Sequence, residues 1–236
     1  MKKTLAFVAL ANLTGLLSSS ALSQAWQCVP PGNLPRPKIE GPKPNEARIV
    51  PVGGYLLTLS WSPEHCHDRA NKDELQCSGK MGDFGFVLHG LWPEGVGKDY
   101  PMWCKKADLL PPKVIAKHIC MTPSVQLLQH EWAKHGTCMA RRPEAYFGAA
   151  KLLYDAIEKP DMERLSRGPL NAGGVADAFA AANPGLPAKA IAVHTNGRGW
   201  LDEVRICLGK DLKPETCGPG KQGAPAKAEV KVGKGG

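Results

Sequence analysis

Eight cysteines constrain what this chain of 236 residues can fold into more than any other feature of its sequence. All of them follow residue 25, and their even number is typical of a disulfide framework in an exported protein. No two are spaced as Cys-x-x-Cys, so neither a zinc ribbon nor a redox-active pair is indicated. The sequence alone leaves their pairing open. The cysteines are Cys28, Cys66, Cys77, Cys104, Cys120, Cys138, Cys207 and Cys217.

The first 25 residues have the three parts of a secretory signal peptide. Met1-Lys2-Lys3 is positively charged, Leu5–Leu17 is apolar, and small residues lead up to Ala25. The apolar run is too short to span a bilayer comfortably. We therefore interpret residues 1–25 as a cleaved signal peptide, expect no membrane span afterwards, and predict a periplasmic or secreted protein.

Three further regions differ in composition. Residues 26–51 are rich in proline, which cannot support a regular hydrogen-bond ladder, so we expect an extended arm. Residues 52–217 form the predicted folded domain. Residues 218–236 are basic and of low complexity, and we expect a disordered tail. The formal net charge of +8 suits a polyanionic partner, although much of the excess lies in this tail.

Hydrophobic patterning mixes scattered strands with separate helices and lacks the regular alternation of a parallel sheet. This mixture predicts an α+β fold. Ser124 is a suitable N-cap for a helix that carries residues 130–135, and loops are expected at 62–83 and 94–112. The predicted strands are Tyr55–Trp61, a strand that ends at His89 and Gly90, Ala190–His194 and Leu201–Leu208, and the further helices are Pro143–Lys159 and Val175–Ala182.

Residues 130–138 read His-Glu-Trp-Ala-Lys-His-Gly-Thr-Cys and concentrate polar chemistry in one short segment. Two imidazoles, a carboxylate and an ammonium are costly to bury unless they pair or take part in a reaction. On a helix, Glu131 and His135 share a face with Lys134 beside them, and His130 lies to one side. The segment could therefore surround one small anion from one wall.

A zinc-binding helix is the main alternative for this segment. Metalloproteases place two histidines at positions i and i+4, on one helix face. His130 and His135 are instead at i and i+5, and Lys134 would set a positive charge beside the metal. The spacing disfavours zinc, and we predict no metal and no other cofactor.

A second segment, residues 84–93, reads Phe-Gly-Phe-Val-Leu-His-Gly-Leu-Trp-Pro. It is typical of a short buried strand that ends at His89 and Gly90. A single histidine in this place is more often structural. Together with the segment at 130–138, however, it favours the interpretation that His89 faces a cleft.

These two segments resemble the two active-site segments of the ribonuclease T2 family, in the family's order. Residues 59–66 and 205–217 agree as well, so the resemblance runs from about Tyr55 to Cys217. It implies a ribonuclease T2-like catalytic domain over residues 52–217, with a central, mainly antiparallel sheet and packed helices. It also implies three disulfides and leaves two cysteines for a fourth. The implied pairs are Cys66–Cys77, Cys104–Cys138 and Cys207–Cys217, with Cys28 and Cys120 remaining.

The resemblance also implies roles for five polar residues. His89 would act as general acid and His135 as general base, although the sequence does not show which histidine does which. Glu131 and Lys134 would stabilise the pentacoordinate intermediate, and His130 would bind phosphate. Glu131 could also keep a neighbouring histidine cationic, because an adjacent carboxylate favours the charged form.

Two residues bear on base preference. Trp92 could stack on a base or simply fill the core beside Pro93. Glu94 occupies the position where some relatives carry an aspartate that contacts a base. This departure leads us to expect broad base specificity.

The predicted function is an exported, metal-independent endoribonuclease, active as a monomer. It would cleave single-stranded RNA through a 2′,3′-cyclic phosphate to leave 3′-phosphate ends. Histidines with pKa values near neutrality suit the acid and base steps of this reaction. A metal-dependent hydrolase that uses His130, Glu131 and His135 is one alternative, which chelation would reveal. A non-catalytic protein that holds RNA on a basic surface is the other, and would show salt-dependent binding without product.

Overall fold

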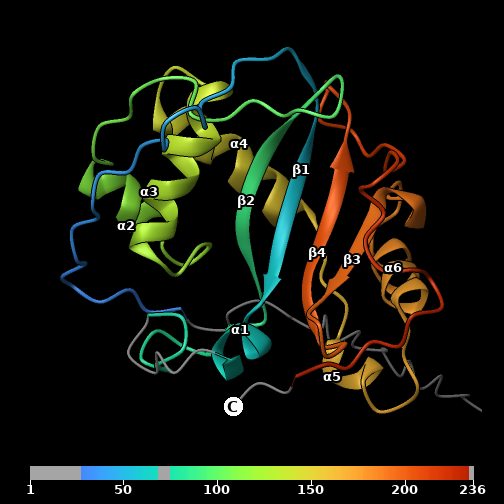
Figure 1. Ribbon diagram of the computed structural model, residues 1–236. Coiled ribbons are helices and arrows are strands. Elements are labelled where there is room, and N and C mark those ends of the chain that lie inside the picture. The colour runs from blue at the N-terminus through green and yellow to red at the C-terminus, as the bar shows by residue number, and fades with distance from the viewer. Residues whose placement is uncertain (1–27, 69–74, 234–236) are drawn as a thin grey trace, which may run out of the picture.

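The computed structural model describes residues 28–68 and 75–233, so the predicted signal peptide lies outside the described residues. The strands form one sheet that crosses the middle of the molecule, and helices lie around it (Figure 1). Among the described residues, no helix is long and apolar enough to cross a membrane. The elements in chain order are β1 (Val52–Trp61), α1 (Ser62–Asp68), β2 (Phe86–Gly95), α2 (Pro112–His118), α3 (Val125–Lys134), η1 (Gly136–Cys138), α4 (Pro143–Ala156), α5 (Met162–Leu165), α6 (Ala172–Ala182), η2 (Ala188–Ala190), β3 (Ile191–Thr195) and β4 (Leu201–Leu208).

The four strands form an antiparallel sheet in the order β2-β1-β4-β3. The predicted α+β fold, with a mainly antiparallel sheet and packed helices, is therefore confirmed. Because β1 lies between β2 and β4, residues from two strands far apart in sequence approach across it. This order brings the strand of His89 close to residues 201–208.

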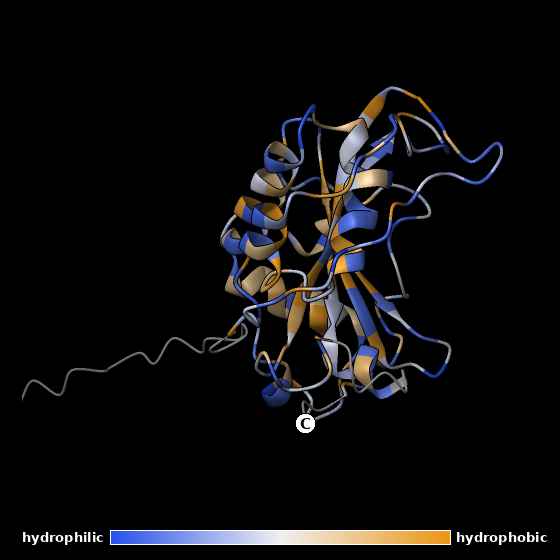
Figure 2. Ribbon diagram, turned by 90° about the vertical axis from the view of Figure 1, so that its left-hand side faces the viewer, coloured by the Kyte–Doolittle hydropathy of each residue, from blue (hydrophilic) through white to orange (hydrophobic). Residues whose placement is uncertain are grey.

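The two faces of the sheet differ in polarity. Leu57 and Leu59 of β1 are buried in the main core, against which α4 and α6 pack. Hydrophobic and hydrophilic residues both occur along the strands (Figure 2). Side chains alternate along a strand, so Thr58 and Ser60 belong to the opposite face, where their lateral partners on β4 are Arg205 and Glu203. This opposite face is the polar one.

Four disulfides staple the domain, as predicted. Cys28–Cys120 pins the proline-rich arm to the segment after α2, and Cys104–Cys138 ties the loop after β2 to the end of η1. The other two, Cys66–Cys77 and Cys207–Cys217, close short loops. The arm has an extended backbone, as expected for its proline content, and pairs with the domain at Arg48 and Met102.

Two predicted boundaries are wrong. The strand of His89 continues to Gly95, because a register shift between Thr58 and Leu59 leaves His89 without a partner and lets pairing resume at Gly90. Residues 62–68 form a helix instead of a loop. Its first turn holds Glu64, a buried carboxylate that accepts a hydrogen bond from Asn196 at 2.6 Å.

The prediction of a disordered tail is wrong for residues 218–233. Val230 is buried in the core, and the backbone of Ala224 donates to the carbonyl of Val193 in β3. A Cβ atom on Gly223 would lie 2.3 Å from that same carbonyl oxygen, so the approach requires glycine. The small residues that lower the sequence complexity are what allow the tail to pack against the edge of the sheet. Residues 234–236 lie outside the described residues.

Candidate active site

The irregularity in β2 presents His89 to the polar face of the sheet. Its side chain is about one-third exposed, and Nδ1 lies 2.6 Å from Oε1 of Glu203 on β4. The hydroxyl of Ser60, on the intervening strand, lies 3.3 Å from the same nitrogen. Three strands therefore fix this imidazole.

Helix α3 supplies the facing wall. Ser124 caps it as predicted, accepting a hydrogen bond from the backbone of Leu127. Glu131 is buried, with its Oε1 3.8 Å from Nε2 of His89. His135 is the C-cap residue, and its backbone N–H donates to the carbonyl of Glu131. The helix end thus sets Glu131 and His135 one turn apart on the same wall.

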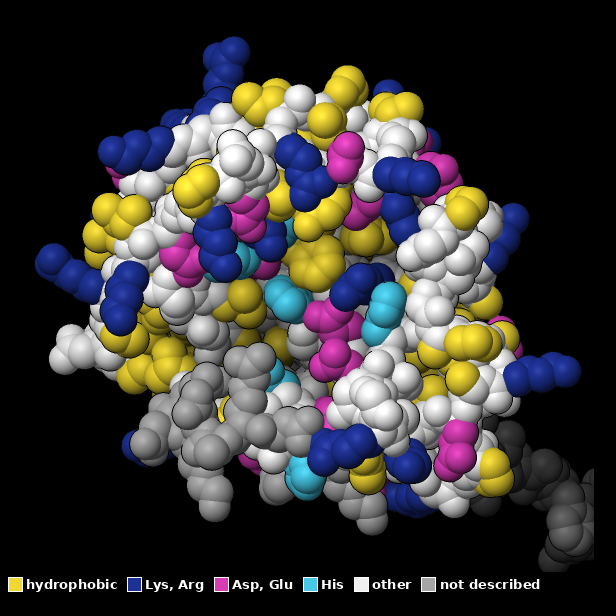
Figure 3. All heavy atoms as spheres, in the orientation of Figure 1, with side chains coloured by type: hydrophobic (Ala, Val, Ile, Leu, Met, Phe, Trp, Pro, Cys, Tyr) yellow, Lys and Arg dark blue, Asp and Glu magenta, His cyan; other side chains and the backbone are white. Residues whose placement is uncertain are grey.

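Trp92 connects the two walls. Its indole N–H donates to Oε2 of Glu131 at 2.8 Å. The ring lies edge-on to His89, with centroids 5.1 Å apart, and stacks on His135 at 5.5 Å. The two imidazoles therefore flank one indole. Figure 3 shows histidine and acidic side chains gathered near the middle of this face of the molecule.

Each histidine is followed by a glycine for a steric reason. A Cβ atom on Gly90 would lie 1.8 Å from Oε2 of Glu131. A Cβ atom on Gly136 would lie 2.5 Å from the ring of Trp132. The close approach of α3 to β2 therefore depends on the absence of a side chain at Gly90, whereas Gly136 allows the end of α3 to pack against Tyr146 of α4.

The two imidazoles have opposite electrostatic surroundings. Burial alone would lower the pKa of His89, but the hydrogen bond to Glu203 and the charge of Glu131 outweigh it and raise the pKa. Burial, and then the neighbouring positive charge of Lys134 and the other histidines, lowers the pKa of His135 to about 2. His89 is thus favoured as a proton donor and His135 as a proton acceptor.

The carboxylates differ too. Burial raises the pKa of Glu131, although His89 and the hydrogen bond from Trp92 oppose this shift. Burial would also raise the pKa of Glu203, but His89 and Arg205 lower it to about 2. Glu203 is therefore the lasting anion beside His89.

Comparison with known proteins agrees with this geometry. The sequence profile of the ribonuclease T2 family matches residues 52–167. A ribonuclease of Aeromonas hydrophila is 38% identical over 167 residues, which cover 66% of this chain and 72% of that relative. The chain belongs to the ribonuclease T2 family. The enzyme class that the resemblance implied, a T2-type endoribonuclease, agrees with the names of these relatives.

Two other similar proteins show how far the likeness extends. A probable ribonuclease of Haemophilus influenzae is 39% identical over 132 residues, 50% of this chain and 47% of that relative, so the match spans about half the relative's length. The solved structure of trichomaglin, an S-like ribonuclease, superimposes with a TM-score of 0.63 at 19% identity. The superposition covers 77% of this chain and 97% of the trichomaglin chain, so the shared fold extends beyond residue 167.

His130 of this T2-family chain contacts the proline-rich arm. Its Nδ1 is 2.5 Å from Oε2 of Glu40 in the proline-rich arm, and its ring meets Trp103 edge-on at 5.6 Å. Glu40 also accepts from Gln126, so the arm is docked on α3. Lys134 is partly buried, and its backbone carbonyl accepts from Trp103 at 2.7 Å. Within residues 28–68 and 75–233, no three His, Cys, Asp or Glu side chains are grouped to hold a metal ion.

Glu94 lies two residues beyond Trp92 on the same face of β2, near the end of the sheet. It forms an ion pair with Lys221 of the C-terminal segment. Both residues line a pocket of about 290 Å³ together with Tyr55 and Lys210. Glu94 is therefore already paired in the structure.

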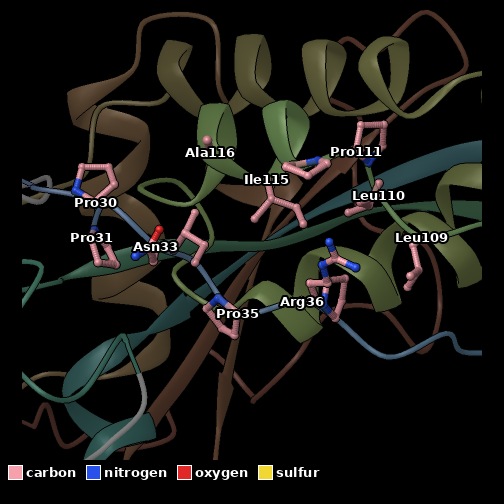
Figure 4. Close-up of a pocket in the computed structure, with 14 residues that line it drawn as sticks. Pro30, Pro31, Asn33, Pro35, Arg36, Leu109, Leu110, Pro111, Ile115 and Ala116 are labelled. Carbon is pink, nitrogen blue, oxygen red and sulfur yellow. The ribbon is translucent and has the colours of Figure 1, made fainter.

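A larger cavity of about 560 Å³ lies between the proline-rich arm and α2 (Figure 4). Prolines dominate its wall, and Arg36 supplies its one charged side chain among the lining residues. None of the T2-type site residues described above lines it, so it is separate from the cleft.

Three residues of the site were missed in the sequence. Glu203 and Arg205 come from a strand that was predicted, and Glu40 comes from the arm. The alternation of Glu203 and Arg205 with the buried Val204 and Ile206 indicates a polar face on that strand. It does not indicate that this face meets His89, which requires the strand order.

Proposed function

We propose that this protein is an exported, metal-independent endoribonuclease that cleaves single-stranded RNA through a 2′,3′-cyclic phosphate. Family membership supports the reaction class. The observation that carries the proposal is the pair of imidazoles on either side of Trp92, one biased toward its protonated form and the other toward its neutral form. A general acid and a general base are what this reaction requires.

In the first step, neutral His135 accepts the proton of the ribose 2′-OH. The 2′-oxygen attacks phosphorus, and the bond from phosphorus to the 5′-oxygen breaks. Protonated His89 donates its proton to that leaving oxygen. The products are a 2′,3′-cyclic phosphate and a free 5′-hydroxyl, and the two histidines have exchanged protonation states.

In the second step the roles reverse. His89, now neutral, accepts a proton from water, whose oxygen attacks phosphorus. The bond to the 2′-oxygen breaks, and His135 returns its proton to that oxygen. A 3′-phosphate remains, and both histidines regain their starting states.

The remaining polar residues stabilise charge. Lys134 supplies a positive charge for the phosphorane, beside Glu131 at the centre of the site. His130 keeps Nδ1 on Glu40, so Nε2 is the nitrogen that would contact a phosphate of the RNA. The arm would then orient His130 without occupying the reaction centre.

Broad base specificity follows from the contacts of Trp92 and Glu94. The indole already stacks on His135, and the guanidinium of Arg205 lies 5.1 Å from its centroid. Glu94 is paired with Lys221. Neither side chain is available to select one base without losing these contacts.

Export and a monomeric state complete the proposal. Four disulfides fit an oxidising compartment, the periplasm or the extracellular medium. One chain supplies every residue assigned a role here. A second copy is therefore not needed to build the cleft.

The test is incubation of the oxidised protein, lacking residues 1–25, with the dinucleotide UpA in the presence of EDTA. Mass spectrometry should find adenosine and uridine 2′,3′-cyclic phosphate, and later uridine 3′-phosphate. Activity that disappears with EDTA and returns with zinc would instead support a metal-dependent hydrolase. Salt-dependent RNA binding without any product would support a non-catalytic protein.

A further inference from the structure

Glu203 is a buried carboxylate with both oxygens engaged. Oε1 lies 2.6 Å from Nδ1 of His89, and Oε2 accepts two hydrogen bonds from the Arg205 guanidinium, at 3.0 and 2.7 Å. The residue is 7% exposed. Burying a carboxylate is costly unless it is paired, and His89 and Arg205 supply this pairing. The question is what the buried carboxylate does for His89.

We propose that Glu203 is a positioning residue whose carboxylate holds Nδ1 of His89 as an N–H donor, so that Nε2 gives the proton to the leaving oxygen. Arg205 fixes the carboxylate in this role. The inference rests on the proposed function and deepens it. It names a third residue, from a strand outside both active-site segments, on which the acid depends.

The geometry supports this role from both sides of the imidazole. Nδ1 is held by Glu203, with Ser60 at 3.3 Å. Nε2 is 3.8 Å from Glu131, beyond ordinary hydrogen-bond length, and therefore keeps its proton for another acceptor. The assignment of the two nitrogens gives His89 a fixed direction.

Arg205 couples this arrangement to the rest of the cleft. Its guanidinium binds Glu203 and also lies over the ring of Trp92. Trp92 in turn donates to Glu131 and stacks on His135. One rigid chain of contacts thus runs from the acid to the base.

The charged groups that act on His89 come from two elements. Glu131 and the C-cap residue His135 belong to α3, whereas Asp202, Glu203 and Arg205 belong to β4. The hydrogen bond from His89 to Glu203 makes the largest contribution that opposes burial in raising the pKa of His89. The pKa of Glu203 is about 2, so its carboxylate is ionised at mildly acidic and neutral pH. Its effect on the pKa of His89 is therefore present throughout this range.

The first experiment is a ¹⁵N NMR titration of the histidines in the otherwise unaltered protein. Neutral His89 should carry its proton on Nδ1, and Nε2 should be the nitrogen that loses its proton as the pH rises. A neutral His89 protonated on Nε2 would overturn the proposal. This readout needs no substrate and no variant, so it is independent of the proposed ribonuclease activity.

The second experiment compares pH profiles of UpA cleavage for Glu203→Gln and for the original protein. The amide can still accept from Nδ1 but carries no charge. The alkaline limb, where His89 loses its proton, should therefore move to lower pH by about 1 to 3 pH units. The loss of activity relative to the original protein should therefore be largest at alkaline pH.

Asp177→Asn is the control. It removes the same charge from an exposed residue of α6, and the alkaline limb should stay in place. An unmoved limb in folded Glu203→Gln, or a loss that is equal at every pH, would overturn the proposal while leaving the ribonuclease activity established. If Glu203→Gln fails to fold, the NMR titration decides. If the original protein does not cleave UpA, the proposed function fails while the titration still reports the role of Glu203.

Discussion

His89 and His135 lie against the same indole, yet the chain gives them opposite surroundings. His89 comes from a strand and meets two carboxylates, Glu131 and Glu203, which raise its pKa against the effect of burial. His135 ends a helix and is buried beside Lys134; among the described residues its Nδ1 has no hydrogen-bond partner, and its pKa falls to about 2. Two residues of the same type are therefore suited to opposite proton transfers by the elements around them.

This difference has a structural origin. The strand side of the cleft is built from the polar face of the sheet, where Glu203 and Arg205 of β4 lie beside Ser60 and Thr58 of β1. The helix side is built from the end of α3, where the charge of Lys134 lowers the pKa of His135 further after burial. The two imidazoles can therefore differ in pKa although they flank one indole, because Glu203 acts on His89 and Lys134 acts on His135.

Removing either histidine should have the largest effect. His89→Ala and His135→Ala should each lower UpA turnover by roughly 10²–10⁴-fold, the usual contribution of a general acid or base. A uridine 3′-phosphate ester with nitrophenol as leaving group separates the two roles, because that oxygen leaves without a proton. It should restore turnover in His89→Ala and not in His135→Ala. Restoration in the other variant would reverse the assignment.

Gly90→Ala tests whether the two sides must approach closely. The new methyl group would overlap the carboxylate of Glu131, so Glu131 or β2 must move and misalign the acid with the base. Activity should fall by about 10²-fold, the loss expected from a displacement of about 1 Å. Gly97→Ala is the control, because a Cβ atom there meets nothing within 4 Å. Equal activities of the two variants would show that the close approach is dispensable.

The pH dependence of cleavage tests the opposite biases directly. A base with the ordinary histidine pKa of about 6.5 would lose about thirtyfold at pH 5, because it becomes protonated there. With the pKa of His135 at about 2, activity at pH 5 should stay close to its maximum. At the other end, activity should persist above pH 6.5 and fall only as His89 deprotonates at its raised pKa. Initial rates in constant ionic strength buffers, with folding checked at each pH, would measure both limbs.

Removing one disulfide from the helix side or one from the strand side of the cleft gives the smallest expected difference, which is in the free energy of unfolding. Cys104–Cys138 closes a separation of 34 residues at the helix side, and Cys207–Cys217 closes 10 residues on β4. Chain entropy predicts losses of unfolding free energy of about 4 and about 3 kcal/mol when both cysteines of a pair become serine. Urea denaturation of the two double variants would measure the difference. A larger loss for the shorter loop would show that local contacts outweigh chain entropy.

Much of the fold followed from the sequence because its signals are local. Apolar residues marked β1, the turn signal between Thr195 and Gly199 marked β3 and β4, the apolar stripe of Tyr146, Phe147 and Tyr154 marked α4, and Ser124 marked the start of α3. The two histidine segments could be recognised because each is continuous. Their separate placement on a strand and on a helix was also expected.

The parts that could not be predicted depend on contacts between distant segments. The meeting of Glu203 with His89 follows from β1 lying between their strands, and sequence patterns do not specify that order. The pairing of Glu40 with His130 depends on where the arm crosses α3. Composition was misleading for residues 218–233, because they are held mainly through their backbone.

The C-terminal segment, residues 218–233, also covers β3, the edge strand of the sheet. β3 pairs with β4 on one side, and on the other the segment meets Val193 through the backbone of Gly223 and Ala224. An uncovered edge strand offers unpaired backbone groups to any other extended chain. Shortening the chain at residue 217 should therefore favour self-association at high concentration, even with the catalytic cleft unchanged. By covering this edge, the small residues of the C-terminal segment, such as Gly223 and Ala224, should reduce aggregation.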